Sequence, residues 1–483
     1  MEARAFAAAS EQLSQHQPAY SARWGMNAKQ RVVGLGLIAG YGAWLYVATE
    51  LAINSAAIAI ATLFGVIIAM RFWTAFAAFF RRPQAQALRA GDDDLPTLTV
   101  LVPLYREANV VPQLVAALSR LDYPRHLLDV KLLVEADDPE TITALGPQRL
   151  PAWFEIIPVP PGVPRTKPKA LNYALAFARG EFVAIFDAED APDPDQPRAA
   201  VAAFRSGPAN LAVVQAPLQV HNGGDSRIAR QFALEYAIHF CVWLPLFARL
   251  RLPLPLGGTS NYFRQSALQR VGGWDAWNVT EDADIGMRLA RFGYAAGMIS
   301  PATLEEAPMR LRQWRSQRTR WIKGHLQTWL VLNRHPSRAM RELGVTGYLS
   351  THVTLGGGLL AALLHGPLYL WIAVNMFWLG HAEVWHGVMF GLGYISAVAA
   401  AFAARSGHAS FWTVLTMPAY WPLQSWAMLW ALFEMQLRPH FWSKTQHGIT
   451  RSQPLPPEAR PARLEQPQES GAQLHFQFLQ DAR

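Results

Sequence analysis

The sequence has a single cysteine, Cys241, and comparatively few charged residues. One cysteine excludes an intrachain disulfide and the paired thiolates of a structural zinc site. Charged residues make up 16% of the 483 positions, against roughly a quarter in an average soluble domain. Hydrophobic residues make up 51%. This balance predicts a chain that is partly embedded in a membrane.

Long stretches without basic residues locate the expected spans. Residues 32–69 contain no Lys or Arg, and Glu50 is their only acid. A helical span needs about 20 apolar residues, so residues 32–80 are expected to form two transmembrane helices that turn near Glu50. Basic residues lie on both sides, including Arg31 before and Arg71 after. Both flanks, and with them the N-terminal segment 1–31, are therefore expected in the cytoplasm.

A second membrane region is expected toward the C-terminus. Residues 344–379 contain no Asp, Glu, Lys or Arg. This segment is too long for one ordinary span, so Gly366 and Pro367 are predicted to mark a hairpin. Two more apolar stretches follow at residues 384–404 and 411–432. The sequence thus predicts about four transmembrane helices in residues 342–434 and six in the whole chain.

Between the two membrane regions, residues 95–305 alternate strand-like and helix-like segments. Apolar runs at residues 98–103, 130–134 and 182–186 each end in a loop, and helical patterns separate them. This alternation predicts a mostly parallel sheet whose ligand lies at the carboxyl ends of the strands. The expected fold is an α/β domain with a mostly parallel mixed sheet, embedded in a helical transmembrane bundle.

Acidic side chains recur at these strand ends. Asp187 and Glu189 follow the third apolar run, and two carboxylates so placed can bind a hard cation that also holds a diphosphate. Acidic turns and helix caps have the same composition, so a purely structural role stays open for this motif. Asp137 and Asp138, after the second run, share that ambiguity. Their recurrence at successive strand ends favours a functional site.

Two later motifs pair a carboxylate with a cationic, aromatic surface. Thr280-Glu281-Asp282 precedes a helical pattern, where Thr280 could cap the helix and the acids could favour its N-terminus. A carboxylate there can also activate a hydroxyl group, which is a poor nucleophile at neutral pH. Residues 306–341 follow and are rich in Arg and Trp, a composition that predicts amphipathic helices at the membrane interface.

Taken in order, these segments resemble the family 2 glycosyltransferases, in the membrane-embedded branch that includes cellulose and hyaluronan synthases. The resemblance runs from about residue 97 to 326 and implies a GT-A fold. Val102-Pro103-Leu104-Tyr105-Arg106-Glu107 is similar to the nucleotide-binding segment, and Lys167 to Asn172 is similar to the segment beside the donor. The residues that the resemblance assigns to the donor nucleotide and diphosphate are Pro103, Tyr105, Glu107, Asp137, Asp138, Lys167, Asp187, Gln317 and Arg320.

The same resemblance assigns the remaining roles. Asp282, with Glu281 beside it, takes the position of the general base, and Trp321 that of the ring that stacks on the acceptor sugar. Gly258 and Thr259 match a segment near the acceptor. Asp187 and Glu189 match the metal positions, with Mg²⁺ or Mn²⁺ implied, and Glu stands where a second Asp is usual, which leaves Glu189 or Asp190 as the second ligand.

A last motif lies beyond the second membrane region. Residues 435–451 resemble the gating loop of cellulose synthases, in which Thr445 and His447 would contact the donor. A short basic segment beside the membrane is the alternative interpretation. The Pro- and Gln-rich residues 452–483 predict a disordered tail.

The resemblance implies an inverting, metal-dependent hexosyltransferase. UDP-glucose is the favoured donor, with GDP-mannose and an N-acetylglucosamine donor left open. The expected product is a polysaccharide that leaves through the transmembrane bundle; transfer of one sugar to a lipid carrier is the alternative, and a non-catalytic nucleotide-sugar-binding or transport component is a less favoured one. We expect a multi-pass protein of a bacterial inner membrane, in contact with its lipids and without a nucleic-acid partner. The sequence does not identify an export partner.

Overall fold

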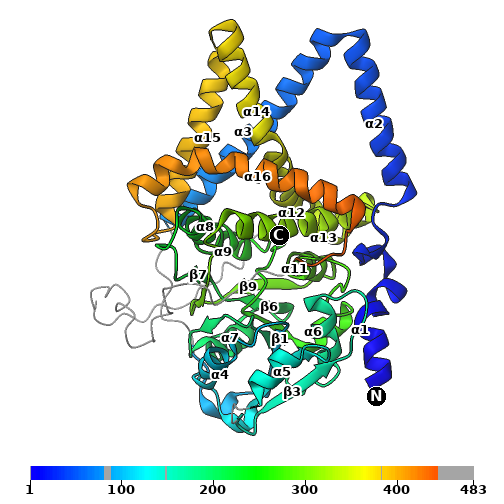
Figure 1. Ribbon diagram of the computed structural model, residues 1–483, viewed down its shortest axis with the longest axis vertical. Helices are drawn as coiled ribbons and strands as arrows, with labels where there is room; N and C mark the ends of the chain where they lie inside the picture. Colours follow the sequence, from blue (N-terminus) through cyan, green and yellow to red (C-terminus); the bar gives the residue numbers. More distant parts are fainter. Residues whose placement is uncertain (1, 81–88, 147–149, 382, 444–483) are drawn as a thin grey trace, which may run out of the picture.

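The structure is a computed structural model that describes residues 2–80, 89–146, 150–381 and 383–443. An α/β domain forms one end of the molecule, and long apolar helices extend from the other (Figure 1). Helices that lie across the molecule separate these two parts. The predicted fold class is confirmed.

A seven-stranded mixed sheet forms the centre of the α/β domain. Its strand order is β3-β2-β1-β4-β8-β6-β9, and only β8 runs antiparallel to its neighbours. The strands are β1 Leu98–Leu104, β2 Leu128–Glu135, β3 Phe154–Val159, β4 Phe182–Ile185, β6 Leu211–Gln215, β8 Asn261–Arg264 and β9 Ala295–Met298. A small second sheet has the order β5-β10-β7, formed by β5 Ala191–Pro192, β7 Leu218–Val220 and β10 Thr303–Glu305.

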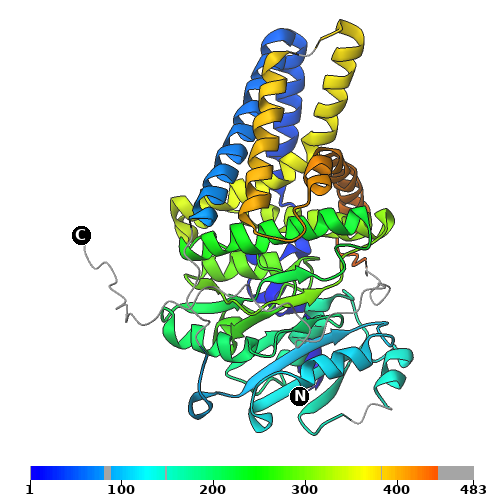
Figure 2. The ribbon, with the colours of Figure 1, turned by 90° about the vertical axis from the view of Figure 1, so that its left-hand side faces the viewer.

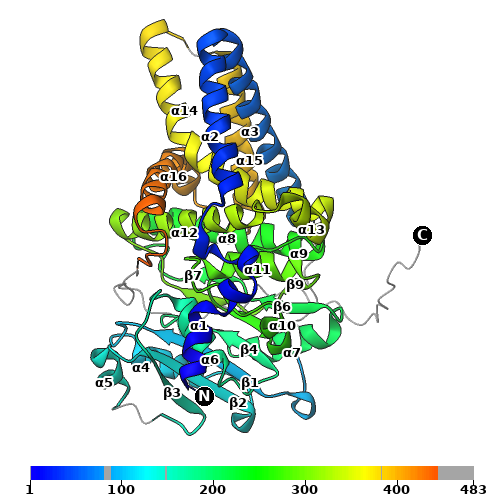
Figure 3. The same cartoon turned by 90° about the vertical axis from the view of Figure 1, so that its right-hand side faces the viewer.

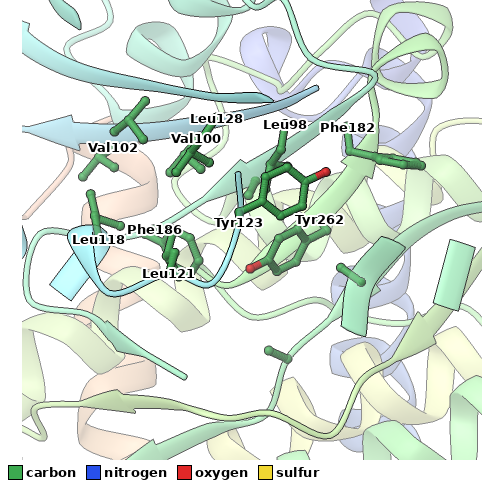
Figure 4. Packing of buried hydrophobic residues seen from close by; sticks show 14 of the residues in the cluster. Leu98, Val100, Val102, Leu118, Leu121, Tyr123, Leu128, Phe182, Phe186 and Tyr262 are labelled. Atoms are coloured by element: carbon green, nitrogen blue, oxygen red, sulfur yellow. The ribbon is translucent and has the colours of Figure 1, made fainter. Parts of the chain in front are cut away.

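Helices cover both faces of the large sheet. The helices of this part of the chain are α4 Val111–Ser119, α5 Pro139–Leu145, α6 Lys167–Leu175, α7 Gln196–Ser206, α8 Arg227–Ile238, α9 Leu244–Arg249, α10 Gln265–Arg270 and α11 Glu281–Arg291. Of these, α8 packs against β7 of the small sheet and against the later helices α15 (Val384–Ala403) and α16 (Phe411–Leu437). Because both faces are covered, β1 and β2 are almost continuously buried, as their unbroken apolar runs predict. In the core drawn in Figure 4, Leu98 and Val100 of β1 lie near Phe182 and Tyr262.

The N-terminal region connects the two parts of the molecule. Helix α1 (Glu2–His16) packs along α6, as Figure 3 shows. Helix α2 (Ala28–Val47) then rises from the α/β domain, and α3 (Thr49–Phe79) returns toward it. The break between α2 and α3 falls at Ala48, close to the turn expected near Glu50.

The remaining helices form the interface and the rest of the apolar part. Helices α12 (Leu311–Leu332) and α13 (Pro336–Thr351) lie between the α/β domain and the long helices. They are followed by α14 (Gly357–Leu379), α15 (Val384–Ala403) and α16 (Phe411–Leu437). Figure 2 shows α14 and α15 rising beside α2 and α3, whereas α16 lies across the molecule in Figure 1.

The membrane region differs from the expected six spans. Four helical segments in the described part of the chain are long and apolar enough to cross a membrane: Thr49–Phe79, Arg227–Arg249, Pro336–Trp378 and Val384–Ala403. The hairpin predicted at Gly366 and Pro367 is wrong, because α14 continues through both residues. A proline frees backbone groups that neighbouring helices can satisfy. Here the Gly366 N–H donates to the Ser425 hydroxyl of α16 at 2.7 Å.

Candidate active site

A cavity of about 1180 Å³ lies where the strand ends meet α11 and α12. Ligands of α/β sheets bind at such carboxyl ends. The predicted site residues that line it are Pro103, Tyr105, Glu107, Lys167, Asp187, Glu189, Gly258, Glu281, Asp282, Gln317, Arg320 and Trp321. The fold therefore brings together donor, base and acceptor candidates that lie far apart in the sequence.

Lys167 connects the acidic side chains of this cavity. At the first position of α6, its ammonium group donates to the Asp187 carboxylate and to the Gly258 carbonyl, each at 2.5 Å. The Glu281 carboxylate lies 3.7 Å away. Burial alone would lower the pKa of Lys167, but the charges of Asp187 and Glu281 outweigh it and hold that pKa above its ordinary value. Lys167 is therefore a fixed positive charge between the two acidic motifs.

The turn after β4 separates the roles of its acids. Asp190 is fully buried and accepts hydrogen bonds from the Asp187 N–H and the Thr259 hydroxyl. Burial raises the pKa of Asp190 well above its ordinary value. Asp190 thus shapes the turn, while Asp187 and Glu189 line the cavity. This arrangement favours Glu189 over Asp190 as the second metal ligand.

Two carboxylates suit an ion that is shared with the substrate. The described part of the chain has no group of three or more His, Cys, Asp or Glu side chains that could hold a metal by itself. Mg²⁺ is commonly held by one or two carboxylates together with substrate phosphates. Asp187 and Glu189 fit that pattern, and their assignment as metal ligands stays a prediction.

The candidate base lies in the first turn of α11. Glu281 is only 4% exposed, and burial raises its pKa to about 7 against the opposing charge of Lys167. Burial also raises the pKa of Asp282, although its carboxylate accepts the Ala283 N–H at 2.7 Å. A methyl group at Gly258 would lie 3.2 Å from Asp282 Oδ2 and 3.9 Å from Asp187 Oδ2. The glycine thus leaves open the space between these carboxylates.

Close packing of α12 against the start of α11 joins the two motifs. A Cβ on Gly324 would lie 2.1 Å from the Thr280 hydroxyl oxygen, so only glycine permits this approach. The Val279 N–H donates to the Gln327 side chain at 3.1 Å. Thr280 itself makes no side-chain cap, unlike the alternative considered from the sequence. Contacts with α12 hold this end of α11.

Trp321 belongs to an aromatic cluster inside the cavity. Its ring stacks on Tyr236 at 6.1 Å and lies 5.7 Å from Phe232, and the Arg318 guanidinium lies 4.9 Å above it. Sequence reasoning missed the contribution of α8. The spacing of Phe232, Tyr236 and Phe240 by four residues was the available signal, because it places them on one helix face.

The diphosphate candidates on α12 retain unused hydrogen-bonding atoms. Gln317 Oε1 and Arg320 Nε are buried without a hydrogen-bond partner in the structure. The Arg320 guanidinium also lies 5.2 Å from the centre of the Trp442 ring. Trp442 lies in the segment predicted to be a gating loop, while Thr445 and His447 lie outside the described residues.

Three of the predicted site residues do not line the cavity: Asp137, Asp138 and Thr259. Asp138 is buried and caps α5, accepting from the Arg106 N–H and from Thr141, so it does not line the cavity. Thr259 is fully buried and also lies off the cavity, because its hydroxyl serves the Asp190 turn. Asp137 forms an ion pair with Arg165, which lines the cavity in its place.

Arg165 is a further residue that sequence reasoning missed. Its guanidinium donates to the Tyr105 hydroxyl at 3.1 Å and lies 5.4 Å from the Tyr105 ring centre. It lies two positions before Lys167 in the sequence, which was the only signal. Asp137 and Asp138 thus act on the Tyr105 side of the cavity through neighbouring residues.

Comparison with known proteins agrees with this architecture. Residues 182–435, over half of the chain, match the glycosyl transferase family group 2. The chain belongs to this family, and the predicted family resemblance is confirmed.

Two curated relatives are each 27% identical to the chain. One is the probable glycosyltransferase YdaM of Bacillus subtilis (strain 168), matched over 48% of this chain and 56% of the relative. The other is glucomannan 4-beta-mannosyltransferase 7 of Arabidopsis thaliana, matched over 49% of this chain and 44% of the relative. The chain thus spans about half the length of these relatives.

A solved structure also resembles the chain. The mannosyltransferase PcManGT from Pyrobaculum calidifontis, in complex with GDP-Man and Mn²⁺, is 22% identical. The match covers 77% of this chain and 98% of that chain, with a TM-score of 0.48.

Proposed function

We propose that this glycosyltransferase transfers a hexose from a nucleotide sugar to an acceptor hydroxyl with inversion of configuration. One observation carries the proposal: Asp282, the Lys167–Asp187 pair and Trp321 all line a single cavity. A base, a charged diphosphate site and a sugar-stacking ring are the parts that this reaction needs.

The donor lies across the strand ends in this proposal. The nucleotide would be bordered by Tyr105, Glu107 and Arg165. The diphosphate would be bound by Gln317 and Arg320, whose Oε1 and Nε atoms have no hydrogen-bond partner among the described residues. Asp187 and Glu189 would hold Mg²⁺ or Mn²⁺, which supplies positive charge to the departing diphosphate. Arg320 supports the same charge from α12.

The chemical step is a single displacement. Asp282 takes the proton of the acceptor hydroxyl, and the oxygen attacks the anomeric carbon from the face opposite the nucleotide. The bond from that carbon to the diphosphate oxygen breaks, and the electron pair leaves with the nucleoside diphosphate. An α-linked donor therefore gives a β-glycoside. Trp321 orients the acceptor ring for this attack.

The cavity also reaches the apolar helices, which bears on the product. Its lining includes Gly358 and His365 of α14, Ala397 and Ala400 of α15, and Trp421 of α16. This continuity supports a polymer that passes from the site into the bundle of an inner-membrane protein with a cytoplasmic catalytic domain. Transfer of one sugar to a lipid carrier is the second candidate, since a cavity at a bilayer surface also suits a lipid.

A panel of donors tests the proposal. UDP-glucose, GDP-mannose and UDP-N-acetylglucosamine are each supplied with Mg²⁺ or Mn²⁺, and released nucleoside diphosphate is measured. GDP-mannose is included because the plant relative is named a mannosyltransferase. Acceptor-dependent release is expected from one donor, and its absence with all of them contradicts the function. Mass analysis of the product separates long chains from a lipid that carries one sugar.

The rate of transfer should rise with pH through about 7. Burial raises the pKa of Glu281 to about 7, and a proton shared by Glu281 and Asp282 would occupy the base. A kcat/KM profile from pH 5 to 9 measures this rise. In Glu281→Gln the rise should move to lower pH, because the neighbouring negative charge is gone. A profile without a rise near pH 7 in the unaltered enzyme contradicts this assignment.

Stability should change in the opposite direction over the same range. The folded-state pKa of Glu281, about 7, exceeds the ordinary 4.5, so the folded protein holds a proton that the unfolded chain has lost. The contribution of this proton to the free energy of unfolding is fully present below pH 4.5 and is lost as the pH rises through about 7. Glu281→Gln should remove this dependence in thermal unfolding.

Replacing Trp321 by Ala should impair acceptor use more than donor binding. The loss of the stacked ring is expected to raise the acceptor KM by up to roughly tenfold, since aromatic contacts contribute about 0.5–1.5 kcal/mol. Donor binding, measured by calorimetry, should stay within about twofold because the ring faces Tyr236 rather than Lys167. Unchanged acceptor kinetics would remove Trp321 from the acceptor site.

A further inference from the structure

Arg71 is a cationic side chain of the cavity for which the proposed reaction has no use. It lies in α3, within a segment whose composition is that of a membrane span. Ionisable side chains in such segments are rare and commonly mark ligand sites. The same cavity is lined by Ile238, Trp243, Gly358, His365, Ala397 and Ala400.

The position of Arg71 is not that of a residue that merely sets topology. Such an arginine extends its side chain toward lipid headgroups or water. Helix α3 instead packs against α15, α14 and the π-helical turn η5 (His239–Trp243). Arg71 is partly buried among these elements and lines the internal cavity. Its charge is therefore presented to whatever enters that cavity.

No side chain neutralises Arg71 at close range. Among the residues that the structure describes, none forms a hydrogen bond or ion pair with its guanidinium, whereas the Thr74 hydroxyl donates to its backbone carbonyl. Glu235 is the acid whose charge acts on Arg71. The Glu235 carboxylate already accepts hydrogen bonds from Arg318, from the Tyr420 hydroxyl at 2.9 Å and from the Gln424 amide at 3.1 Å. The Glu235 carboxylate is thus shared among several donors. No carboxylate in the described part of the chain forms an ion pair with the Arg71 guanidinium.

We propose that Arg71 binds an oxyanion, a phosphate or carboxylate group, carried by the acceptor. A guanidinium presents paired N–H donors that match either group, and a cavity between apolar helices strengthens the attraction. This inference rests on the proposed function, because it places the anion in the same cavity as Asp282. Two acceptors carry such a group: a lipid phosphate and an acidic sugar chain.

The test compares matched anionic and neutral acceptors. Polyprenyl phosphate in phosphatidylcholine vesicles is paired with vesicles that contain unphosphorylated polyprenol. A uronic-acid tetrasaccharide is paired with a neutral tetrasaccharide. Nucleoside diphosphate release above the acceptor-free rate is measured for the wild type, Arg71→Gln, Arg71→Lys and the control Arg31→Gln. Arg31 is an exposed cation of the neighbouring helix α2 that does not line the cavity.

The wild type should prefer one anionic acceptor over its neutral counterpart, and the preferred pair identifies the source of the anion. Arg71→Gln should lose roughly tenfold or more of that preference, since hydrogen bonds to charged groups are strong, and should keep its acceptor-free nucleotide release. Arg71→Lys should keep part of the preference, and Arg31→Gln all of it. Equal use of anionic and neutral acceptors by the wild type, or an unchanged preference in Arg71→Gln, overturns the proposal, as does an equal loss in Arg31→Gln.

Failure of the Arg71 proposal can be distinguished from failure of the proposed transferase function. If the wild type releases nucleotide from no donor, the transferase proposal fails, while the Arg71 site can still be tested by binding. Polyprenyl phosphate or the uronic-acid tetrasaccharide should then bind more tightly to the wild type than to Arg71→Gln in calorimetry, with the matched neutral compound as the control. An equal response of both proteins overturns the Arg71 site itself.

Discussion

Replacing Asp282 by Asn should lower the rate of sugar transfer roughly 10²–10⁴-fold, the usual contribution of a positioned base. An amide of the same shape can still fill the first turn of α11, but it cannot take the proton of the acceptor hydroxyl. Donor affinity should stay nearly constant, because Lys167 and Asp187 remain paired. Single-turnover kinetics together with calorimetry of donor binding separate the two effects.

Asp284→Asn is the matched control for this loss. Asp284 lies on the same helix and is buried, but it pairs with Arg288 at 2.7 Å and does not line the cavity. Its replacement should lower the thermal stability, because breaking a buried ion pair costs up to about 3–5 kcal/mol. The kcat of the folded fraction should be retained. Substantial transfer by Asp282→Asn would exclude Asp282 as the base.

Replacing Lys167 by Met should lower kcat/KM roughly 10²–10³-fold, the range seen when one preorganised donor is removed from a catalytic site. The ammonium group joins Asp187 to Gly258 and lies beside Glu281, so its loss leaves like charges facing one another. The charge of Lys167 also lowers the pKa of Glu281. The rise of activity with pH should therefore move above its position near 7 in the unaltered enzyme.

Lys169→Met distinguishes this effect from a general loss of stability. Lys169 is fully buried two residues further along α6 and pairs with Glu135 at 3.1 Å. The same substitution there should lower the unfolding temperature without moving the pH profile. If both variants shift the profile equally, Lys167 has no special role in setting the charge of the acidic cluster.

Much of the α/β domain was predictable because its signals are local. A continuous apolar run predicts a strand covered on both faces, and β1, β2 and β4 follow the runs at residues 98–103, 130–134 and 182–186. Strand ends meet at one edge of a parallel sheet, so acids that follow such strands were expected to gather there. Asp187 and Glu189 do so.

Local composition did not decide the surroundings of every acid, or the course of the helix that contains Pro367. Asp138 and Asp190 have the same local pattern as Asp187, but their oxygens are used by backbone N–H groups and hydroxyls of neighbouring turns. A proline commonly breaks a helix in water, yet α14 continues through Pro367. In the preceding turn, the Ser425 hydroxyl of α16 accepts from the Gly366 N–H and donates to the Ala362 carbonyl. Neither outcome depends on nearby sequence alone.

The sequence by itself determined the order of strands, acids and apolar helices, and with them the family. Those features depend on neighbouring residues and on the length of apolar segments. Only the tertiary structure decided which carboxylates face the cavity, and that Gly324 lets α12 approach Thr280 so that Trp321 and Asp282 share one cavity. It also placed Arg71 inside the cavity rather than at a lipid surface. These outcomes depend on contacts between distant segments, which close packing fixes and local patterns do not contain.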